Sequence, residues 1–186
     1  MRSVLFAAVV GLLGAAALHI LIVLAVPGFT GNDAYTRIAS LGDVQRFYPL
    51  PAAPARSGAP FSDDPALRIA VCALSIAERP VRLYAPDTVP FWSLGLFDRA
   101  SNEVFSMNDR TSVGGALDVV VATPVQLNAI RKALPAELSQ SILVEMADQD
   151  GYAVLRTFAP TATMEEGARA FLADAGCETI DTGATE

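Results

Sequence analysis

The fold class is decided by the stretch Leu117-Asp118-Val119-Val120-Val121-Ala122-Thr123-Pro124. Its hydrophobic run is continuous rather than alternating, which is typical of a strand that is buried on both faces. Thr123 followed by Pro124 indicates a helix start, because a Thr hydroxyl caps free backbone N–H groups and Pro fits the first turn. The stretch therefore predicts a buried strand and then a helix that runs to about residue 133 or 134.

On both sides of this stretch, short runs of β-type residues alternate with turn residues. Asp150-Gly151 is a strong hairpin signal between the last two runs. A final helix is expected over 164–175, capped by Thr163 and stopped by Gly176. Together these elements predict an α+β fold with a β-sandwich-like core and peripheral helices. The expected strands are 67–76, 80–85, 91–98, 103–107, 117–122, 141–147 and 152–159.

Upstream of residue 67, the sequence predicts a stalk. Thr30-Gly31-Asn32-Asp33 indicates a helix start, since Thr or Asn can cap backbone N–H groups. Apolar residues then recur at helical spacing and predict an amphipathic helix to about Tyr48. Residues 49–65 carry five prolines with little periodicity, which indicates an extended linker. The apolar positions of the expected helix are Ala34, Ile38, Leu41, Val44 and Phe47.

The N-terminus carries the longest apolar segment of the chain. From Val4 to Val26 no residue has a formal charge, and His19 is the only strongly polar one. About 20 apolar residues in a helix cross a hydrocarbon core of roughly 30 Å. A cleaved signal peptide has a shorter apolar region and an Ala-x-Ala-like end, whereas this segment ends in Val26-Pro27. We therefore expect an uncleaved, single-pass anchor with membrane lipid around it.

Charge sets the expected orientation and excludes one class of partner. Arg2 precedes the apolar segment and the first charge after it is Asp33, so a cytoplasmic N-terminus and an exported remainder are expected. The chain has 13 Lys+Arg against 20 Asp+Glu, a net charge of -7, and nucleic-acid binding needs a basic face instead. The expected divisions are a transmembrane anchor (1–27), a stalk helix with Pro-rich linker (28–66) and an exported β-rich domain (67–186).

Cys72 and Cys177 are the only cysteines. An exported compartment permits disulfides, and two cysteines allow one intramolecular pair, so we predict Cys72–Cys177. Two buried free thiols are the alternative. Zinc needs about four Cys, His or carboxylate ligands, and the single His lies in the expected span. Without His in the exported part, Ser-His-Asp and Cys-His catalysis are excluded there, and neither a metal nor a cofactor is expected.

Polar residues of two short segments form the best candidate ligand or partner site. If strands 91–98 and 103–107 pair as a hairpin, we expect both segments to leave it at the same end. Two carboxylates and two guanidiniums could bind a small polar ligand, tie the turns together as ion pairs, or catalyse hydrolysis as paired carboxylates. The candidate residues are Asp98, Arg99, Asn108, Asp109 and Arg110.

Two further side chains have a functional and a structural interpretation. Trp92 is the only Trp, and it could contact a ligand or partner. Alternatively it fills the core, with its indole N–H bonded locally. Asp118 is expected to cap or pair at the end of its strand.

Several motifs resemble a known family. They are Phe91-Trp92-Ser93-Leu94-Gly95-Leu96-Phe97-Asp98-Arg99, Asn108-Asp109-Arg110-Thr111, Gly114-Gly115-Ala116-Leu117-Asp118 and Ala122-Thr123-Pro124. Together they resemble the bacterial domain-of-unknown-function family 1254, in its short membrane-anchored branch. The resemblance implies a β-sandwich with peripheral helices. It also implies a partner, namely a second small membrane protein that carries a sister domain. It implies no reaction.

These observations favour a single-pass protein of the bacterial inner membrane with a periplasmic C-terminal domain. Its molecular function is expected to be a binding or assembly module, and an enzyme is not favoured. Two alternatives remain from the sequence. One is a hydrolase-like envelope enzyme that uses the Asp/Arg residues, and the other is a small-ligand sensor with an apolar pocket beside Trp92.

Overall fold

The computed structural model describes residues 2–29, 33–51, 64, 66–86 and 88–181. It contains helices and two sheets, which confirms the α+β prediction. The helices are α1 (Arg2–Phe29), α2 (Ala34–Ala39), α3 (Pro124–Lys132) and α4 (Ala162–Asp174), with a 3-10 turn η1 (Ala136–Leu138). The strands are β1 (Tyr48–Pro49), β2 (Leu67–Ser75), β3 (Val81–Ala85), β4 (Trp92–Asp98), β5 (Glu103–Asn108), β6 (Leu117–Ala122), β7 (Ile142–Glu145), β8 (Asp150–Phe158) and β9 (Gly176–Thr179).

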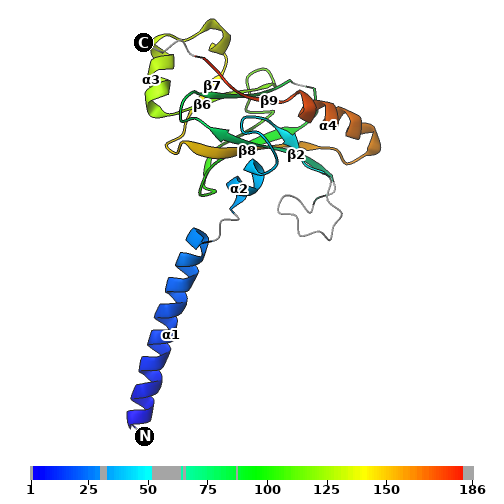
Figure 1. Cartoon of the computed structure of the whole chain (residues 1–186). Coiled ribbons are helices and arrows are strands. Elements are labelled where there is room, and N and C mark those ends of the chain that lie inside the picture. Colours follow the sequence, from blue (N-terminus) through cyan, green and yellow to red (C-terminus); the bar gives the residue numbers. More distant parts are fainter. Residues whose placement is uncertain (1, 30–32, 52–63, 65, 87, 182–186) are drawn as a thin grey trace.

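The strands form two sheets that share one core (Figure 1). Sheet A has the order β1-β2-β8-β4-β5, and all of its pairs are antiparallel. Sheet B has the order β7-β6-β3-β9, and its β6–β7 pair is parallel. Leu94 and Leu96 of sheet A and Val119 and Val121 of sheet B are buried in the core between them.

The stretch 117–124 folds as predicted. Val119 and Val121 enter the shared core, while Val120 lies with Leu127 and Ile130 of α3 in a second buried cluster on the other face. β6 is therefore buried on both faces. α3 begins with a capping box, in which Thr123 Oγ1 accepts from the Gln126 backbone N–H and the Gln126 side chain accepts from that of Thr123.

The predicted stalk helix is shorter than expected. α2 ends at Ala39, and its cap is Asp33, whose Oδ1 accepts the Thr36 N–H at 2.7 Å. The prediction of a helix to Tyr48 was wrong, because the chain turns to pair with sheet A. The Gln45 N–H donates to the Ala73 carbonyl at 2.7 Å, and Tyr48 opens β1 beside β2. Of the apolar positions, Ile38 packs on the outer face of sheet A and Phe47 lies in the shared core, whereas Leu41 and Val44 are exposed. Most of the predicted linker over 49–65 lies outside the described residues.

The predicted hairpin at Asp150-Gly151 was also wrong. β7 pairs with β6 in sheet B, whereas β8 lies between β2 and β4 in sheet A. The intervening residues therefore cross from one sheet to the other. β8 gains ladder partners on both sides, and this pairing outweighs the local turn preference of Asp-Gly. At the final helix, Thr161 rather than Thr163 is the N-cap residue, and Gly176 opens β9.

Helix α1 stands apart from both sheets. Its segment Arg2–Ala25 is 24 residues long, and it is apolar enough to cross a membrane by length and composition. None of this segment is buried against the rest of the protein. Figure 1 shows it leading into α2, which lies on the outer face of sheet A.

Candidate functional site

The predicted Asp/Arg cluster is divided by the hairpin that carries it. β4 and β5 pair as expected, with Phe97 opposite Glu103 and Ser93 opposite Asn108. Asp98 and its neighbour Arg99 therefore lie at the turn, and Asn108 lies at the open end. The expectation that both segments leave at one end was wrong, because Asp98 ends β4 at the turn, whereas Asn108 ends the antiparallel β5 at the opposite end of the hairpin. The paired-carboxylate arrangement does not form there.

At the turn, both predicted residues have local partners. Asp98 accepts the backbone N–H and the side-chain amide of Asn102, each at 2.8 Å. Arg99 Nη1 lies 3.2 Å from Asp150 Oδ2, and its guanidinium lies 5.0 Å from the ring centre of Tyr35. These contacts hold the turn and attach α2 to sheet A.

At the open end, the predicted residues organise a loop. Asn108 Oδ1 accepts the backbone N–H groups of Arg110 and Thr111 at 3.0 and 3.2 Å. The Asp109 N–H donates to the Trp92 carbonyl at 3.2 Å, and Asp109 Oδ1 is enclosed without a hydrogen-bond partner among the described residues. The Arg110 side chain is exposed. The turn interpretation accounts for Asn108.

Trp92 lies in the core. Its side chain is 0% exposed, and its indole N–H donates to the Gly115 carbonyl at 2.8 Å. This is the structural alternative derived from the sequence. The loop 109–116 is thereby tied to the end of β4.

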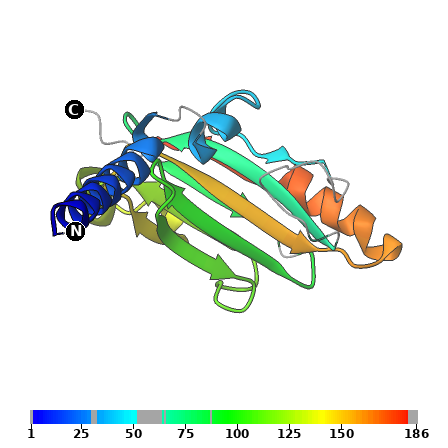
Figure 2. The same ribbon diagram turned by 90° about the horizontal axis from the view of Figure 1, so that it is seen from below.

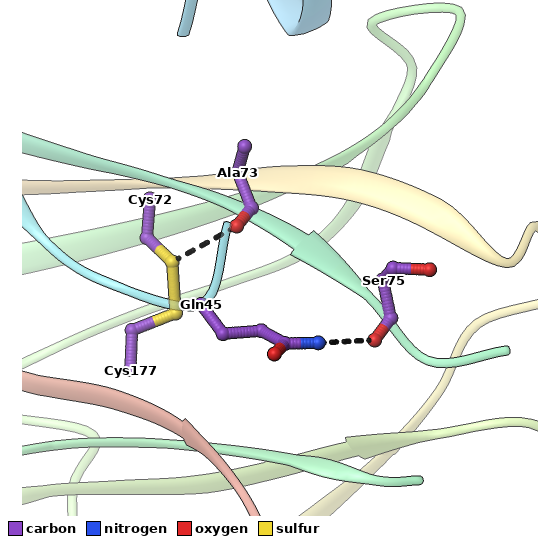
Figure 3. The surroundings of a disulfide bond; sticks show 5 residues. All are labelled: Gln45, Cys72, Ala73, Ser75 and Cys177. Atoms are coloured by element: carbon purple, nitrogen blue, oxygen red, sulfur yellow. Dashed lines mark hydrogen bonds between the residues drawn. A yellow bond between two sulfur atoms is a disulfide. The ribbon is translucent and has the colours of Figure 1, made fainter. Parts of the chain in front are cut away.

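The predicted disulfide is confirmed. Cys72 of β2 and Cys177 of β9 are bonded, and the bond joins sheet A to sheet B. Figure 3 shows Gln45 beside it, with Nε2 donating to the Ser75 carbonyl at 3.0 Å. The Cys72 sulfur carries no proton in this bond and lies 3.3 Å from the Ala73 carbonyl oxygen. Both cysteines are buried, so the bond has a structural role.

The structure assembles a different charged cluster on the outer face of sheet B. Register places Arg82 opposite Glu178 and Tyr84 opposite Asp118, on three neighbouring strands. Arg82 Nε and Nη2 donate to Asp118 Oδ1 and Oδ2 at 2.8 and 3.0 Å. Ser141 Oγ donates to Asp118 Oδ2 at 2.8 Å. We call Arg82, Tyr84, Asp118 and Glu178 the sheet B cluster.

The electrostatics of this cluster follow from its contacts. The hydrogen bonds to Asp118 raise the pKa of the Arg82 guanidinium, which stays charged. Burial, and then the negative charge of Glu178, raise the pKa of the Tyr84 phenol. The cluster and Asp174 line a hollow of about 590 Å³. Three carboxylates and one guanidinium therefore line this hollow, an arrangement that suits a cationic group.

Part of this cluster can be predicted from sequence patterns. Alternation along Val81–Ala85 places Arg82 and Tyr84 on one face, and Asp118 was expected to pair at the end of its strand. Glu178 could not be connected to them, because nothing local shows that β9 lies beside β3. Among the described residues, no group of three or more His, Cys, Asp or Glu is placed to hold a metal ion.

Comparisons with known proteins agree with this fold. The family model "Protein of unknown function (DUF1254)" matches residues 46–178. The VPA0106 protein from Vibrio parahaemolyticus has a similar structure, with a TM-score of 0.60 and 16% identity over 78% of this chain and 33% of its own. A putative uncharacterized protein from Burkholderia cenocepacia has a TM-score of 0.50 and 17% identity over 76% of this chain and 36% of its own. The chain thus spans about a third of the length of these two solved structures. No curated protein sequence matches it.

Proposed function

The chain belongs to the DUF1254 family of proteins of unknown function, and we propose that it is a single-pass, membrane-anchored binding module of the bacterial envelope. Its N-terminus lies in the cytoplasm and its two-sheet domain lies in the periplasm. The domain binds a second membrane protein, and the sheet B cluster is part of the contact.

Helix α1 is the main observation that supports the membrane anchor in this proposal. Its 24-residue apolar segment exposes large side chains such as Leu12 and Leu13, and none of it packs on the domain. Burial of apolar surface contributes about 25 cal/mol per Å², so a helix of this kind needs an apolar environment. A bilayer provides that environment at this length. Arg2 before the span supports the orientation, and the Cys72–Cys177 bond suits an oxidising compartment.

The partner is inferred from the lengths of the neighbours and from the position of the cluster. In the two similar structures, this fold makes up about a third of a longer chain. A second chain with a sister domain would supply here what those proteins carry in one chain. The sheet B cluster lies on the side of the domain away from α2 and α1 (Figure 1), so a partner can reach it. Its surplus of carboxylates suits a basic side chain of that partner.

Extraction of membranes tests the anchor. We expect the full chain to stay with the membrane in alkaline carbonate, because its attachment is apolar. The double variant Leu12→Arg/Leu13→Arg should move to the soluble fraction, since charged residues at the centre of a span are costly. Leu134→Arg is the matched control, since Leu134 is an exposed Leu of the domain. Release of the unmodified chain by carbonate would contradict the anchor.

Co-purification in mild detergent tests the partner. We expect the full chain to be recovered with a second membrane protein, and the double variant Asp174→Asn/Glu178→Gln to lose it. The control variant Glu137→Gln/Glu145→Gln removes two exposed carboxylates outside the cluster and should keep it. Recovery of an isolated monomer, or equal loss in both variants, would contradict a role for the sheet B cluster.

A further inference from the structure

The outer face of sheet A is only half covered. Ile38 of α2 packs with Val71 and Val154, over β2 and the middle of β8. Figure 2, viewed from the side of α1, shows β4, β5 and the end of β8 uncovered beside α2. We call this uncovered part the open half.

Three polar side chains form a row across the open half. Arg156 of β8 lies opposite Ser93 of β4, and Ser93 lies opposite Asn108 of β5. Their neighbours Leu155 and Met107 enter the shared core, so the three point to the outer face. Directly opposed residues have Cβ atoms about 4.5–5.5 Å apart, within reach of one small ligand. We call Arg156, Ser93 and Asn108 the donor row.

The donor row has hydrogen-bond donors without a partner among the described residues. Arg156 is half-buried, and it has no ion pair or side-chain hydrogen bond with any described residue. Its cross-strand neighbours are Ile69 and Ser93, neither of which is acidic. Asn108 Oδ1 is occupied by two backbone N–H groups, which leaves its Nδ2 as a donor. A guanidinium, a hydroxyl and an amide therefore lie side by side on three neighbouring strands, without a counter-charge in the row.

The outer face of sheet A, including the open half, lies on the side of the domain from which α1 extends (Figure 1). Only residues 30–32 separate the last residue of α1 from Asp33, so the two are at most about 14 Å apart. α2, which follows at once, packs on the same face of sheet A. If α1 spans a membrane, this face is turned toward the headgroup layer.

We infer that the donor row binds the phosphate of an anionic phospholipid headgroup in the membrane that holds α1. The Arg156 fork matches phosphate oxygens, and the Ser93 hydroxyl and Asn108 amide donate to the remaining ones. Such binding fixes the tilt of the domain on the membrane and leaves the sheet B cluster facing outward. The inference rests on the proposed anchoring.

Lipid retention by the full chain tests the donor row. The protein in dodecylmaltoside micelles is titrated with phosphatidylglycerol or phosphatidylcholine, and native mass spectrometry counts the lipids bound. Phosphatidylglycerol should be retained in preference to phosphatidylcholine. Arg156→Gln should weaken its retention roughly tenfold or more, as expected for the loss of a charged hydrogen bond. Arg131→Gln, at an exposed Arg of α3, is the control and should change nothing.

Asn108→Asp separates binding from folding. The Asp carboxylate still accepts the N–H groups of Arg110 and Thr111, so the loop is kept, but the amide donor is replaced by a negative charge. We expect the variant to keep its Tm and to lose phosphatidylglycerol.

Three outcomes would overturn the inference. They are unchanged retention in Arg156→Gln, equal retention of phosphatidylcholine, and displacement of the lipid by inorganic phosphate at equal concentration, which would assign the row to free phosphate. Carbonate extraction tests the membrane anchor separately. If the protein stays in the membrane but retains no phosphatidylglycerol, lipid binding by the donor row is contradicted and the anchor is not.

Discussion

A disulfide between Cys72 in β2 and Cys177 in β9 connects the two sheets, although the two residues are 105 positions apart in the sequence. β9 is otherwise held in sheet B by a four-residue pairing with β3. The bond therefore attaches β9 to β2, which lies between β1 and β8 in sheet A. Reduction leaves β9 dependent on its pairing with β3 and on burial.

Removal of the disulfide should lower stability substantially. A bond that closes a loop of about 100 residues contributes about 4.7 kcal/mol in the chain-entropy account, and less if the native bond is strained. We expect the double variant Cys72→Ala/Cys177→Ala to lose roughly 10 °C in Tm. Trp92, the only Trp, lies in the core, and its fluorescence reports unfolding of the domain in mild detergent. Reductant should lower the Tm of the parent and leave that of the double variant unchanged; equal Tm values in oxidant would contradict the prediction.

Asp118→Asn should destabilise the domain more than loss of a surface ion pair. Arg82 and Asp118 are bonded through two donors, and their side chains are only 28% and 24% exposed. Removing one charge leaves a half-buried guanidinium without its partner, which costs about 1–2 kcal/mol after allowance for solvent. Urea unfolding measures the difference. Asp181→Asn is the matched control, because the Arg79–Asp181 pair is largely exposed and should contribute about 0–1 kcal/mol.

Gly176→Ala should be destabilising, because a Cβ at this position would run into the ring of Tyr84. We expect a loss of about 1–3 kcal/mol. Adding Tyr84→Ala should recover part of it, so the double variant should lose less than the sum of the single ones. Gly167→Ala in α4 is the contrasting control. Nothing lies near its Cβ position, and an Ala there should add about 0.5–1 kcal/mol. If the losses of stability in the two single variants simply add in the double variant, the Tyr84 ring is not what destabilises Gly176→Ala.

Glu165 should contribute to the acid sensitivity of the domain. Hydrogen bonds from Arg68, and then from Arg169, lower the pKa of its carboxyl. The unfolded chain therefore binds the proton more readily than the folded one. The contribution is present above the ordinary Glu pKa of about 4.3 and is lost as pH falls through the lower folded value. Glu165→Gln should lower Tm at neutral pH and flatten its fall below about pH 4. The neighbouring Glu166→Gln should keep the parental profile, and an unchanged acid limb in Glu165→Gln would contradict the prediction.

Local patterns predicted the elements better than their partners. All seven expected strands are present, and α3 begins at the predicted Thr123-Pro124. Two strands were missed, β1 and β9, because two- and four-residue strands leave little periodicity to detect. Asp150-Gly151 favours a turn, but this local preference does not determine which strands pair. β8 pairs with β2 and β4 rather than with β7. Pairing of the two cysteines needed no register, since only two were present.

The sequence by itself determined the apolar α1, the burial of β6 on both faces, the start of α3 and the disulfide partners. Each of these depends on residue type and on spacing within a few positions. Only the tertiary structure decided which strands are neighbours. It separated Asp98 from Asn108, joined Arg82 to Asp118 across 36 positions, and aligned Arg156 with Ser93. The physical reason is that strand order and register depend on backbone pairing and burial between distant segments, which local periodicity does not encode.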